Sequence, residues 1–562
     1  MSAVDEQPRE AGGPGGGSMG PGGSRRIAKA AGGAGPPHQP PLHQPSTPHA
    51  RHFGCLKPAK WGCGCLALVL LVLVAAVLIF LNRVPKTYPT VTNPIPSPAP
   101  GHSLGGGLDG FDSPYLGHTG SWDGKGGAMG GGPKTRDLDT ELGMGLRWTF
   151  MPIYWRVLEP GHAVDLAIET PPAWRALDAF IIAAHQRKLN VLMQAPVIGG
   201  NAGGPPAWAG RREKGNSAPA NMDAAAAFAG KLAARYAPGG TLAIREGWQQ
   251  RYGVRAWELD NEPNGYLTCW KNQGADYAEF VTKAAAAIRQ VDTQAVIIGP
   301  AANIGSQSLA WIESTLDAQA LRGSPEFRRH GQAYSIGPIL DVVSFHSYEG
   351  LDTAFAGEDR TVEVAFSEVR AVFERWLDRA AGFTYPRKED YWHTEGNFDF
   401  LGVLSRERRA AWRVQFLTRA FAAGIRKAMV MDASRPEQTA VRTYIRVLPN
   451  PFPMQRANDR VRTLNGTPVV FCHPDNANAE AGRVWVLWAT AGSGDADVEV
   501  PALRAQVESV LIDGTESSIA VTNGQLRIHL RGETKMAPPV LLIDRVAPLS
   551  HKSKGYSRFG VL

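Results

Sequence analysis

The 562-residue chain is long enough for about two to four domains, and its 43% hydrophobic and 20% charged content is ordinary for a globular protein. Its net charge of +7 is uneven, because the first 60 residues hold seven basic and three acidic side chains and so account for +4. No basic helix or aromatic–basic sheet motif accompanies this charge, which argues against a nucleic-acid-binding protein.

Residues 1–60 consist mainly of Gly, Pro, Ser, Ala and His, with few large apolar side chains. Such a segment cannot bury enough apolar surface to offset the entropy lost on ordering, so it is predicted to be a disordered tail. Its histidines could bind metal loosely, although a solvated tail is the simpler interpretation.

A membrane anchor is predicted next. Trp61–Leu81 contains no charged residue, and at about 1.5 Å per residue its 21 residues would cover roughly 30 Å, the thickness of a bilayer core. We therefore expect a single transmembrane helix within residues 61–82, uncleaved because it follows a long tail. Basic residues precede it, which places the tail in the cytoplasm and the remaining chain in the periplasm or outside the cell. The Pro-rich residues 83–100 would form an extended linker.

Residues 101–461 alternate between apolar strands and helices of crossover length. Strands are expected at Gly101–Leu108, Leu146–Tyr154, Asn190–Ala195, Val254–Leu259, Ala295–Gly299, Leu340–His346, Tyr391–Thr394 and Lys427–Met431. Helices are expected at Pro172–Arg187, Met222–Tyr236, Asp276–Val291, Leu309–Ala318, Val362–Ala380 and Arg406–Ala423. This α/β pattern, with no Gly-rich phosphate loop after the first strand, predicts a (β/α)8 TIM barrel rather than an open sheet.

Residues 462–546 lack helical periodicity and contain short alternating runs, which predict an antiparallel β-sandwich. Strands are expected at Thr467–Cys472, Arg483–Thr490, Ala496–Val500, Ser509–Ile512, Ser518–Thr522, Gln525–Leu530 and Val540–Ile543. Asp513-Gly514 and Asn523-Gly524 are typical hairpin turns. Residues 547–562 are predicted to be a loose tail.

Two cysteines, Cys269 and Cys472, belong to the predicted folded part, and no Cys/His spacing suggests a metal site. They could pair in an oxidising compartment, but two buried thiols are the favoured alternative.

Two glutamates stand at the expected C-terminal ends of barrel strands. Glu262 follows the apolar run Val254–Leu259 in Asp260-Asn-Glu-Pro-Asn264, and Glu395 ends Tyr391-Trp-His-Thr-Glu-Gly396. Catalytic residues of TIM barrels lie at these strand ends. A carboxylate pair there could cleave a glycosidic bond, bind a divalent metal or be ordinary surface acid.

Aromatic residues near the predicted strand ends favour the first of these chemistries, since aromatic rings pack on the apolar faces of sugars. Trp155, Trp208 and Trp392 are the candidate sugar platforms, although the first two could equally be core residues. A metal site would need more Asp or His ligands at the strand ends, so we expect no metal and no other cofactor.

The motifs resemble the retaining glycoside hydrolases of clan A. Trp257-Glu-Leu-Asp-Asn-Glu-Pro-Asn264 is similar to the fourth-strand signature that carries the acid/base, and His393-Thr-Glu-Gly396 to the seventh-strand motif that carries the nucleophile. Ser344-Phe-His-Ser-Tyr348 resembles the sixth-strand motif of that clan, and Arg147 matches an arginine near the nucleophile. The Asn-Glu-Pro-Asn form, the loop ending at Trp208 and the appended sandwich resemble family 39, the β-xylosidase and α-iduronidase group.

The resemblance implies double displacement with Glu395 as nucleophile and Glu262 as acid/base. It also implies that Asn261 contacts the sugar 2-hydroxyl and that Tyr348 and Arg147 hold Glu395 ionised. His346 could contact substrate or be a core residue. The sequence therefore predicts a membrane-anchored glycosidase acting on an extracytoplasmic carbohydrate, with a transglycosylase or a non-catalytic glycan-binding protein as alternatives.

Overall fold

The computed structural model describes residues 111–117, 135–198, 204–212, 218–264, 270, 274–304, 308–316, 336–337, 339–349, 361–379, 390–396, 404–431, 433–473, 482–534 and 536–544. The predicted tail, transmembrane segment (61–82), linker and C-terminal tail lie outside these residues, as does Cys269. Within the described part of the chain, no helix combines the length and the apolar character needed to cross a bilayer.

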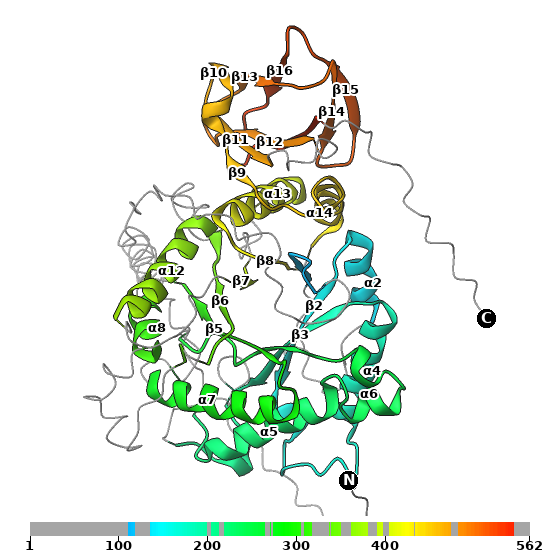
Figure 1. Cartoon of the computed structure of the whole chain (residues 1–562), viewed down its shortest axis with the longest axis vertical. Helices are drawn as coiled ribbons and strands as arrows, with labels where there is room; N and C mark the ends of the chain where they lie inside the picture. Colours follow the sequence, from blue (N-terminus) through cyan, green and yellow to red (C-terminus); the bar gives the residue numbers. More distant parts are fainter. Residues whose placement is uncertain are drawn as a thin grey trace, which may run out of the picture. The chain divides into compact units, whose positions relative to one another are not determined.

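Eight parallel strands form a closed barrel in sequence order, which confirms the predicted TIM barrel (Figure 1). The strands are β1 (Tyr115–Gly117), β2 (Trp148–Tyr154), β3 (Asn190–Val197), β4 (Ala256–Glu258), β5 (Val296–Asn303), β6 (Val342–His346), β7 (Tyr391–Glu395) and β8 (Lys427–Val430). The predicted first strand, Gly101–Leu108, lies outside the described residues, and the barrel is closed by Tyr115–Gly117, which pairs with both β2 and β8. A three-residue strand is too short to give a periodicity signal.

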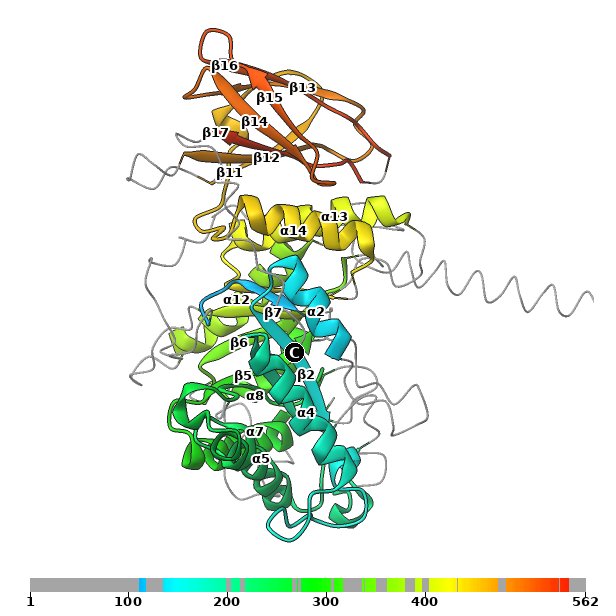
Figure 2. The same cartoon turned by 90° about the vertical axis from the view of Figure 1, so that its right-hand side faces the viewer.

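Helices surround the barrel (Figures 1 and 2). They are α2 (Thr135–Met144), α3 (Trp155–Leu158), α4 (Pro172–Gln186), α5 (Met222–Tyr236), α6 (Thr241–Arg245), α7 (Gly274–Val291), α8 (Ser308–Leu316), α12 (Val362–Arg379), α13 (Arg406–Ala423) and α14 (Arg435–Val447), with short 3₁₀ turns η3 (Ala207–Ala209), η4 (Gln249–Arg251) and η5 (Asn458–Arg460). Two ends show ordinary capping: Ser405 Oγ accepts from Arg408 N, and Gly424 takes φ 103° after α13.

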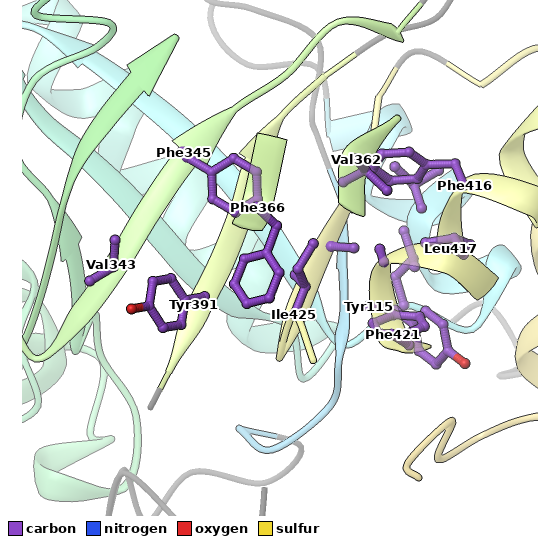
Figure 3. Close-up of a cluster of buried hydrophobic side chains, with 14 of the residues drawn as sticks. Tyr115, Val343, Phe345, Val362, Phe366, Tyr391, Phe416, Leu417, Phe421 and Ile425 are labelled. Atoms are coloured by element: carbon purple, nitrogen blue, oxygen red, sulfur yellow. The ribbon is translucent and has the colours of Figure 1, made fainter. Parts of the chain in front are cut away.

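Apolar side chains fill the space between the strands and the outer helices. Figure 3 shows Phe345 of β6 and Tyr391 of β7 facing Phe366 of α12, at ring-centroid distances of 6.1 and 5.0 Å from Phe366. On the neighbouring side, Tyr115 of β1 meets Phe421 of α13. This packing holds the barrel strands in register under α12 and α13.

The barrel interior has an apolar layer and, further along the strands, a polar layer. The apolar layer includes Leu116, Trp148, Phe150, Leu192, Ala256, Val296, Ile298, Val342, Trp392 and Met429. Because side chains alternate between the two faces of a strand, the residues two positions further along also face inward. On β3, β4, β6 and β7 these are the buried Gln194, Glu258, Ser344 and Thr394. Polar groups thus lie inside the barrel directly below the ends of four strands.

Two antiparallel sheets follow the barrel. One joins β10 (Arg462–Asn465), β13 (Ala496–Pro501) and β16 (Gln525–Leu530); the other joins β15 (Glu516–Ala520), β14 (Gln506–Leu511), β17 (Val540–Asp544), β12 (Arg483–Ala489), β11 (Pro468–His473) and β9 (Gln455–Arg456). Cys472 is buried on β11. The segment before β17 and the start of β15 contact two outer helices: Gln415 Nε2 of α13 donates to Ala537 O at 2.7 Å, and Arg446 of α14 pairs with Glu516.

Of the two predicted hairpin turns, one joins neighbouring strands and one does not. Asp513-Gly514 connects β14 to β15, which pair in one sheet. At Asn523-Gly524 both residues have positive φ and Thr522 bonds Gln525 as in a two-residue turn, yet β15 and β16 belong to different sheets. The local turn was predicted correctly, but its flanking strands diverge at once.

Candidate active site

The loop after β4 holds its residues in an unusual backbone conformation. Asp260 and Glu262 have φ of 67° and 42°, a left-handed region that costs energy for residues with a Cβ. The buried Asp260 carboxylate compensates: its Oδ1 accepts from Ile198 N and Asn261 N, both at 2.9 Å, and its Oδ2 accepts from Trp270 Nε1. The strained turn is therefore built into the fold at the position of the predicted acid/base.

Backbone contacts to β5 fix the same loop from the other side. Glu262 N donates to Ala301 O at 3.1 Å, and Ala301 N donates to Ser344 Oγ at 3.0 Å. Asn264 Nδ2 donates to Asn303 O, and Asn264 Oδ1 accepts from Asn303 N. Glu262 thus projects from a loop that is tied to two neighbouring strands.

Glu395 reaches the site through an irregularity in β7. The pairing of β6 with β7 shifts between Phe345 and His346, so that His346 lies opposite Glu395 instead of Thr394. The shift leaves Thr394 pointing into the barrel and brings the Glu395 carboxylate over the same opening as Glu262. A carboxylate at the last position of a strand is where barrel active sites are found.

Tyr348 and His346 connect the two carboxylates. Tyr348 Oη is in hydrogen-bond contact with Glu262 Oε1 at 3.2 Å and with Glu395 Oε1. His346 Nδ1 lies 3.1 Å from Glu262 Oε1 and 3.8 Å from Glu395 Oε2. One oxygen of each carboxylate and a His346 nitrogen all lie within 4.8 Å of one another. The structure therefore brings together four of the predicted site residues.

The carboxylates are partly exposed, whereas the groups beneath them are not. The Glu262 and Glu395 side chains each retain 21% of their accessible surface, and His346 retains 0%. Burial by itself lowers the pKa of His346, but the charges of Glu395, Glu262 and Glu258 outweigh it and raise that pKa to about 9. His346 is therefore an imidazolium at neutral pH, with its Nδ1–H directed at Glu262.

Asn261 is oriented by a residue that the sequence analysis missed. Gln194 of β3 donates from Nε2 to Asn261 Oδ1 at 3.0 Å and to Glu258 Oε2 at 2.8 Å. Because Oδ1 is held by Gln194, the Asn261 amide presents Nδ2 as a donor. Strand alternation in the sequence could have indicated that Gln194 faces the barrel interior, because it stands two residues beyond the inward-facing Leu192 on the same strand.

Two of the three tryptophans proposed as sugar platforms are core residues instead. Trp155 is fully buried against Phe228 and donates to Glu159 Oε2 at 3.0 Å. Trp392 is fully buried in the apolar layer inside the barrel. Trp208, on η3, is only partly buried, and its Nε1 donates to Glu159 O at 2.9 Å. A ring with no exposed surface cannot pack on a sugar.

The prediction that Arg147 lies near Glu395 is also wrong. It immediately precedes β2, and its carbonyl accepts from Asn190 N at the first residue of β3. In a parallel barrel all strand starts lie at one end, opposite the strand ends that carry Glu262 and Glu395. Arg147 therefore does not reach Glu395.

Glu262, His346 and Glu395 also form the one group of potential metal ligands found in the described part of the chain. Histidine must be neutral to ligate a metal. The raised pKa of His346, about 9, means that a cation would have to displace a proton at neutral pH. The arrangement is better suited to hold a proton between a histidine and two carboxylates.

No protein-family model and no curated protein matches the chain. Among solved structures, it is similar to a family 39 glycoside hydrolase from the gut symbiont Bacteroides cellulosilyticus WH2, with 15% identity, a TM-score of 0.50, and coverage of 77% of this chain and 81% of that one. It is also similar to AbfB, a family 51 α-L-arabinofuranosidase from Bifidobacterium longum, with 11% identity, a TM-score of 0.47, and coverage of 77% of this chain and 95% of that one. A GH30 endoxylanase from Clostridium papyrosolvens C71 is similar too, with 13% identity, a TM-score of 0.46, and coverage of 77% of this chain and 96% of that one. These structural neighbours are glycoside hydrolases, and at 15% identity the likeness to the family 39 enzyme shows the fold alone.

Proposed function

We propose that this protein is a retaining glycoside hydrolase with Glu395 as nucleophile and Glu262 as acid/base. The observation that carries the proposal is the carboxylate pair: oxygens of Glu262 and Glu395 lie within 4.8 Å of each other, at two strand ends of one barrel. Carboxyl groups about 5 Å apart suit a retaining mechanism, whereas inverting enzymes keep them about 6.5–9.5 Å apart to admit a water.

In the first step, Glu395 attacks the anomeric carbon while the bond to the leaving oxygen breaks and Glu262 protonates that oxygen. The His346–Glu262 pair holds the transferred proton between Nδ1 and Oε1. In the second step, Glu262 accepts a proton from water, whose oxygen displaces Glu395 from the sugar. Tyr348, bonded to Glu395, stabilises the carboxylate when it is released. The Asn261 amide is placed to donate to the sugar 2-hydroxyl.

Membership of family 39 and the membrane location are finer parts of this proposal. The first rests on Asp260-Asn-Glu-Pro-Asn264 and the appended antiparallel sheets, and the second on the charge-free run Trp61–Leu81. Protease digestion of cells whose outer envelope has been opened while the cytoplasmic membrane stays intact tests the location. Loss of the barrel while the cytoplasmic markers survive is the expected result, and full protection of the barrel would contradict an extracytoplasmic site.

The reaction is tested by incubating the full-length chain in mild detergent with a panel of activated 2-deoxy-2-fluoro glycosides and measuring intact mass. We expect a glycosyl adduct that peptide mapping places on Glu395, and no adduct in Glu395→Gln. An adduct on Glu262 would reverse the two roles. Neither an adduct nor aryl-glycoside turnover with any sugar, together with glycan binding that Glu395→Gln leaves unchanged, would indicate a non-catalytic glycan-binding protein.

A further inference from the structure

A third carboxylate lies beneath the proposed catalytic pair. Glu258 is the last residue of β4, has no exposed surface, and stands two residues after Ala256, which belongs to the apolar layer inside the barrel. Its side chain therefore points into the barrel, below the loop that carries Glu262. Buried carboxylates are rare unless they are paired, so its partners indicate its role.

Hydrogen bonds link Glu258 to the substrate-facing residues above it. Gln194 Nε2 donates to Glu258 Oε2 at 2.8 Å and to Asn261 Oδ1 at 3.0 Å, so one amide orients both groups. The Ser344 and Thr394 hydroxyls also face Glu258 and lower its pKa. Ser344 Oγ accepts from Ala301 N, and the Ala301 carbonyl accepts from Glu262 N. Thr394 immediately precedes Glu395. Asn261 is thus two contacts from Glu258, Glu262 is three contacts away, and Glu395 follows Thr394 in the chain.

His346 is the charged group that acts most strongly on Glu258. The groups that face His346 are Glu258 and Glu262 from β4 and its loop, Glu395 and His393 from β7, and Tyr348 after β6. Burial, followed by the charge of His346, lowers the pKa of His393 to about 3, so His393 stays neutral. Burial also raises the pKa of Glu258, but His346, Ser344, Thr394 and Gln194 all oppose that rise. Burial has the largest effect, so the pKa of Glu258 lies above its ordinary value, while the Gln194 amide that donates to the carboxylate and the charge of His346 favour its ionised form.

We propose that Glu258 is a positioning residue for the proposed glycosidase reaction: its buried carboxylate keeps the proton of the His346–Glu262 pair in the site and, through Gln194, fixes the Asn261 amide. The expected effect on activity rests on the proposed function. The expected effect on the charge of His346 does not, because it can be measured in the substrate-free protein. A negative charge below the pair raises the affinity of His346 for its proton, and His346 Nδ1 lies 3.1 Å from Glu262 Oε1. Without the Glu258 charge, the His346–Glu262 pair loses its proton at a lower pH than in the wild type. The acid needed for the first step is then no longer available above that pH.

The test compares Glu258→Gln with the wild-type full-length chain, using whichever aryl glycoside the panel identifies. Removing an opposite charge near a titrating group shifts its pKa by about 1–3 units. We therefore expect the alkaline limb of the kcat/KM profile to move down by about one pH unit or more. We also expect kcat to fall about tenfold or more at pH 8 with little change in KM. Glu258→Asp, which keeps the charge, should retain most of the alkaline limb.

A matched control is Asp178→Asn, which alters a buried carboxylate held by Arg235 and Tyr236 on the outer helices. That variant should lose stability and keep the wild-type pH profile. An alkaline limb that is unchanged in a folded Glu258→Gln protein would overturn the proposal. An alkaline limb that moves as far in Asp178→Asn as in Glu258→Gln would also overturn the proposal, because the shift would then reflect a general loosening of the fold.

A second measurement needs no substrate. Histidine labelled with ¹³C at Cε1 reports the charge of each ring by NMR, and His346→Asn identifies the His346 signal. We expect His346 to be an imidazolium at pH 7.5 in the wild type and to titrate at lower pH in Glu258→Gln. A neutral His346 in the wild type would overturn the proposal even if the glutamine variant fails to fold. Confirmation of the His346 shift in a protein without glycosidase activity would instead count against the proposed function alone.

Discussion

At the scale of single residues, Tyr348 is the clearest link between the two carboxylates. Its hydroxyl contacts Oε1 of Glu262 at 3.2 Å and Oε1 of Glu395. Burial, and then the negative charges of Glu395 and Glu262, raise the pKa of Tyr348 far above its ordinary value. The hydroxyl therefore keeps its proton at any working pH and acts as a donor to whichever carboxylate is ionised.

Replacing this donor gives a direct prediction. A hydrogen bond to a charged group is worth about 1.5–3 kcal/mol, so Tyr348→Phe should lower kcat/KM by about 10- to 100-fold. The loss should lie mainly in kcat, because the bond to Glu395 is regained when the carboxylate is released. The measurement is steady-state kinetics on an aryl glycoside, with the 2-fluoro adduct lifetime as a second readout.

Tyr444→Phe is the matched control for Tyr348→Phe. Tyr444 is fully buried on α14, whereas Tyr348 is partly buried, and the Tyr444 hydroxyl contacts Thr418 of α13, away from the carboxylates. This control should change stability slightly and leave kcat untouched. Equal rates for Tyr348→Phe and the wild type would show that Tyr348 is a scaffold residue only.

At the scale of elements, Glu349 joins the strand end that carries Tyr348 to two outer helices. Its Oε1 accepts from Val362 N at the start of α12, and its Oε2 accepts from Trp412 Nε1 and Arg419 Nη2 of α13, both at 2.6 Å. Glu349 is buried, and burial raises its pKa while Arg419 lowers it. A residue next to Tyr348 thus fixes where α12 and α13 sit relative to the site.

Glu349→Gln should therefore affect both stability and activity. An amide cannot accept from all three donors, and it leaves Arg419 without its buried counter-charge, a kind of loss that costs about 3–5 kcal/mol. Urea unfolding should show a decrease of roughly that size, and kcat should fall because Tyr348 loses its support. Glu374→Gln removes a partly exposed pair with Arg370 within α12 and should cost no more than about 0.5 kcal/mol. Similar losses in the two variants would contradict this account of Glu349.

At the scale of the whole molecule, long periodic segments were predictable and short or position-dependent features were not. Helices α5 and α13 begin and end as expected, since each has a polar N-cap and an amphipathic body. β1 and β9 were missed because two or three residues show no periodicity. Helix α14 was missed although Ser434 and Glu437 mark its start.

The residues of the candidate site also fall into those that local sequence could predict and those that it could not. Glu262 and Glu395 could be placed at one end of the barrel because strand ends are readable from proline, glycine and hydrophobic runs. Trp155 and Trp392 were misplaced because an aromatic residue near a strand end carries no mark of which face it occupies. The contact of Gln194 with Asn261 joins residues far apart in sequence, and only the closed barrel brings them together.

The barrel interior also contains a buried cation whose titration should appear in the stability of the molecule. Lys427, the first residue of β8, donates from Nζ to Phe111 O and Ser113 O, both at 2.6 Å. The same nitrogen lies 4.8 Å from the ring centroid of Trp148 and 5.1 Å from that of Trp392. Burial lowers the pKa of Lys427 to about 7, against the opposing charges of Asp112 and Asp390 and with a further lowering from Arg426.

The sign of the effect follows from proton binding. Between the folded pKa of about 7 and the ordinary value of 10.5, the unfolded chain binds a proton at Lys427 that the folded chain does not. Across this window the free energy of unfolding should therefore rise with pH, by at most about 1.4 kcal/mol per pH unit. Below about pH 7 both states are protonated and Lys427 contributes no further pH dependence.

Lys427→Met isolates this contribution because other alkaline titrations are common to both proteins. The wild-type free energy of unfolding minus that of Lys427→Met, obtained from urea titrations, should increase from pH 7 to pH 10 and stay flat from pH 5 to pH 6. Lys188→Met at an exposed position is the control and should give a difference that does not depend on pH. Parallel curves for the wild type and Lys427→Met would mean that Lys427 keeps its proton in the barrel. In that case the two carbonyls and the aromatic rings around Nζ would be stabilising a buried ammonium ion, and the floor of the barrel would carry a permanent positive charge opposite the carboxylates at its mouth.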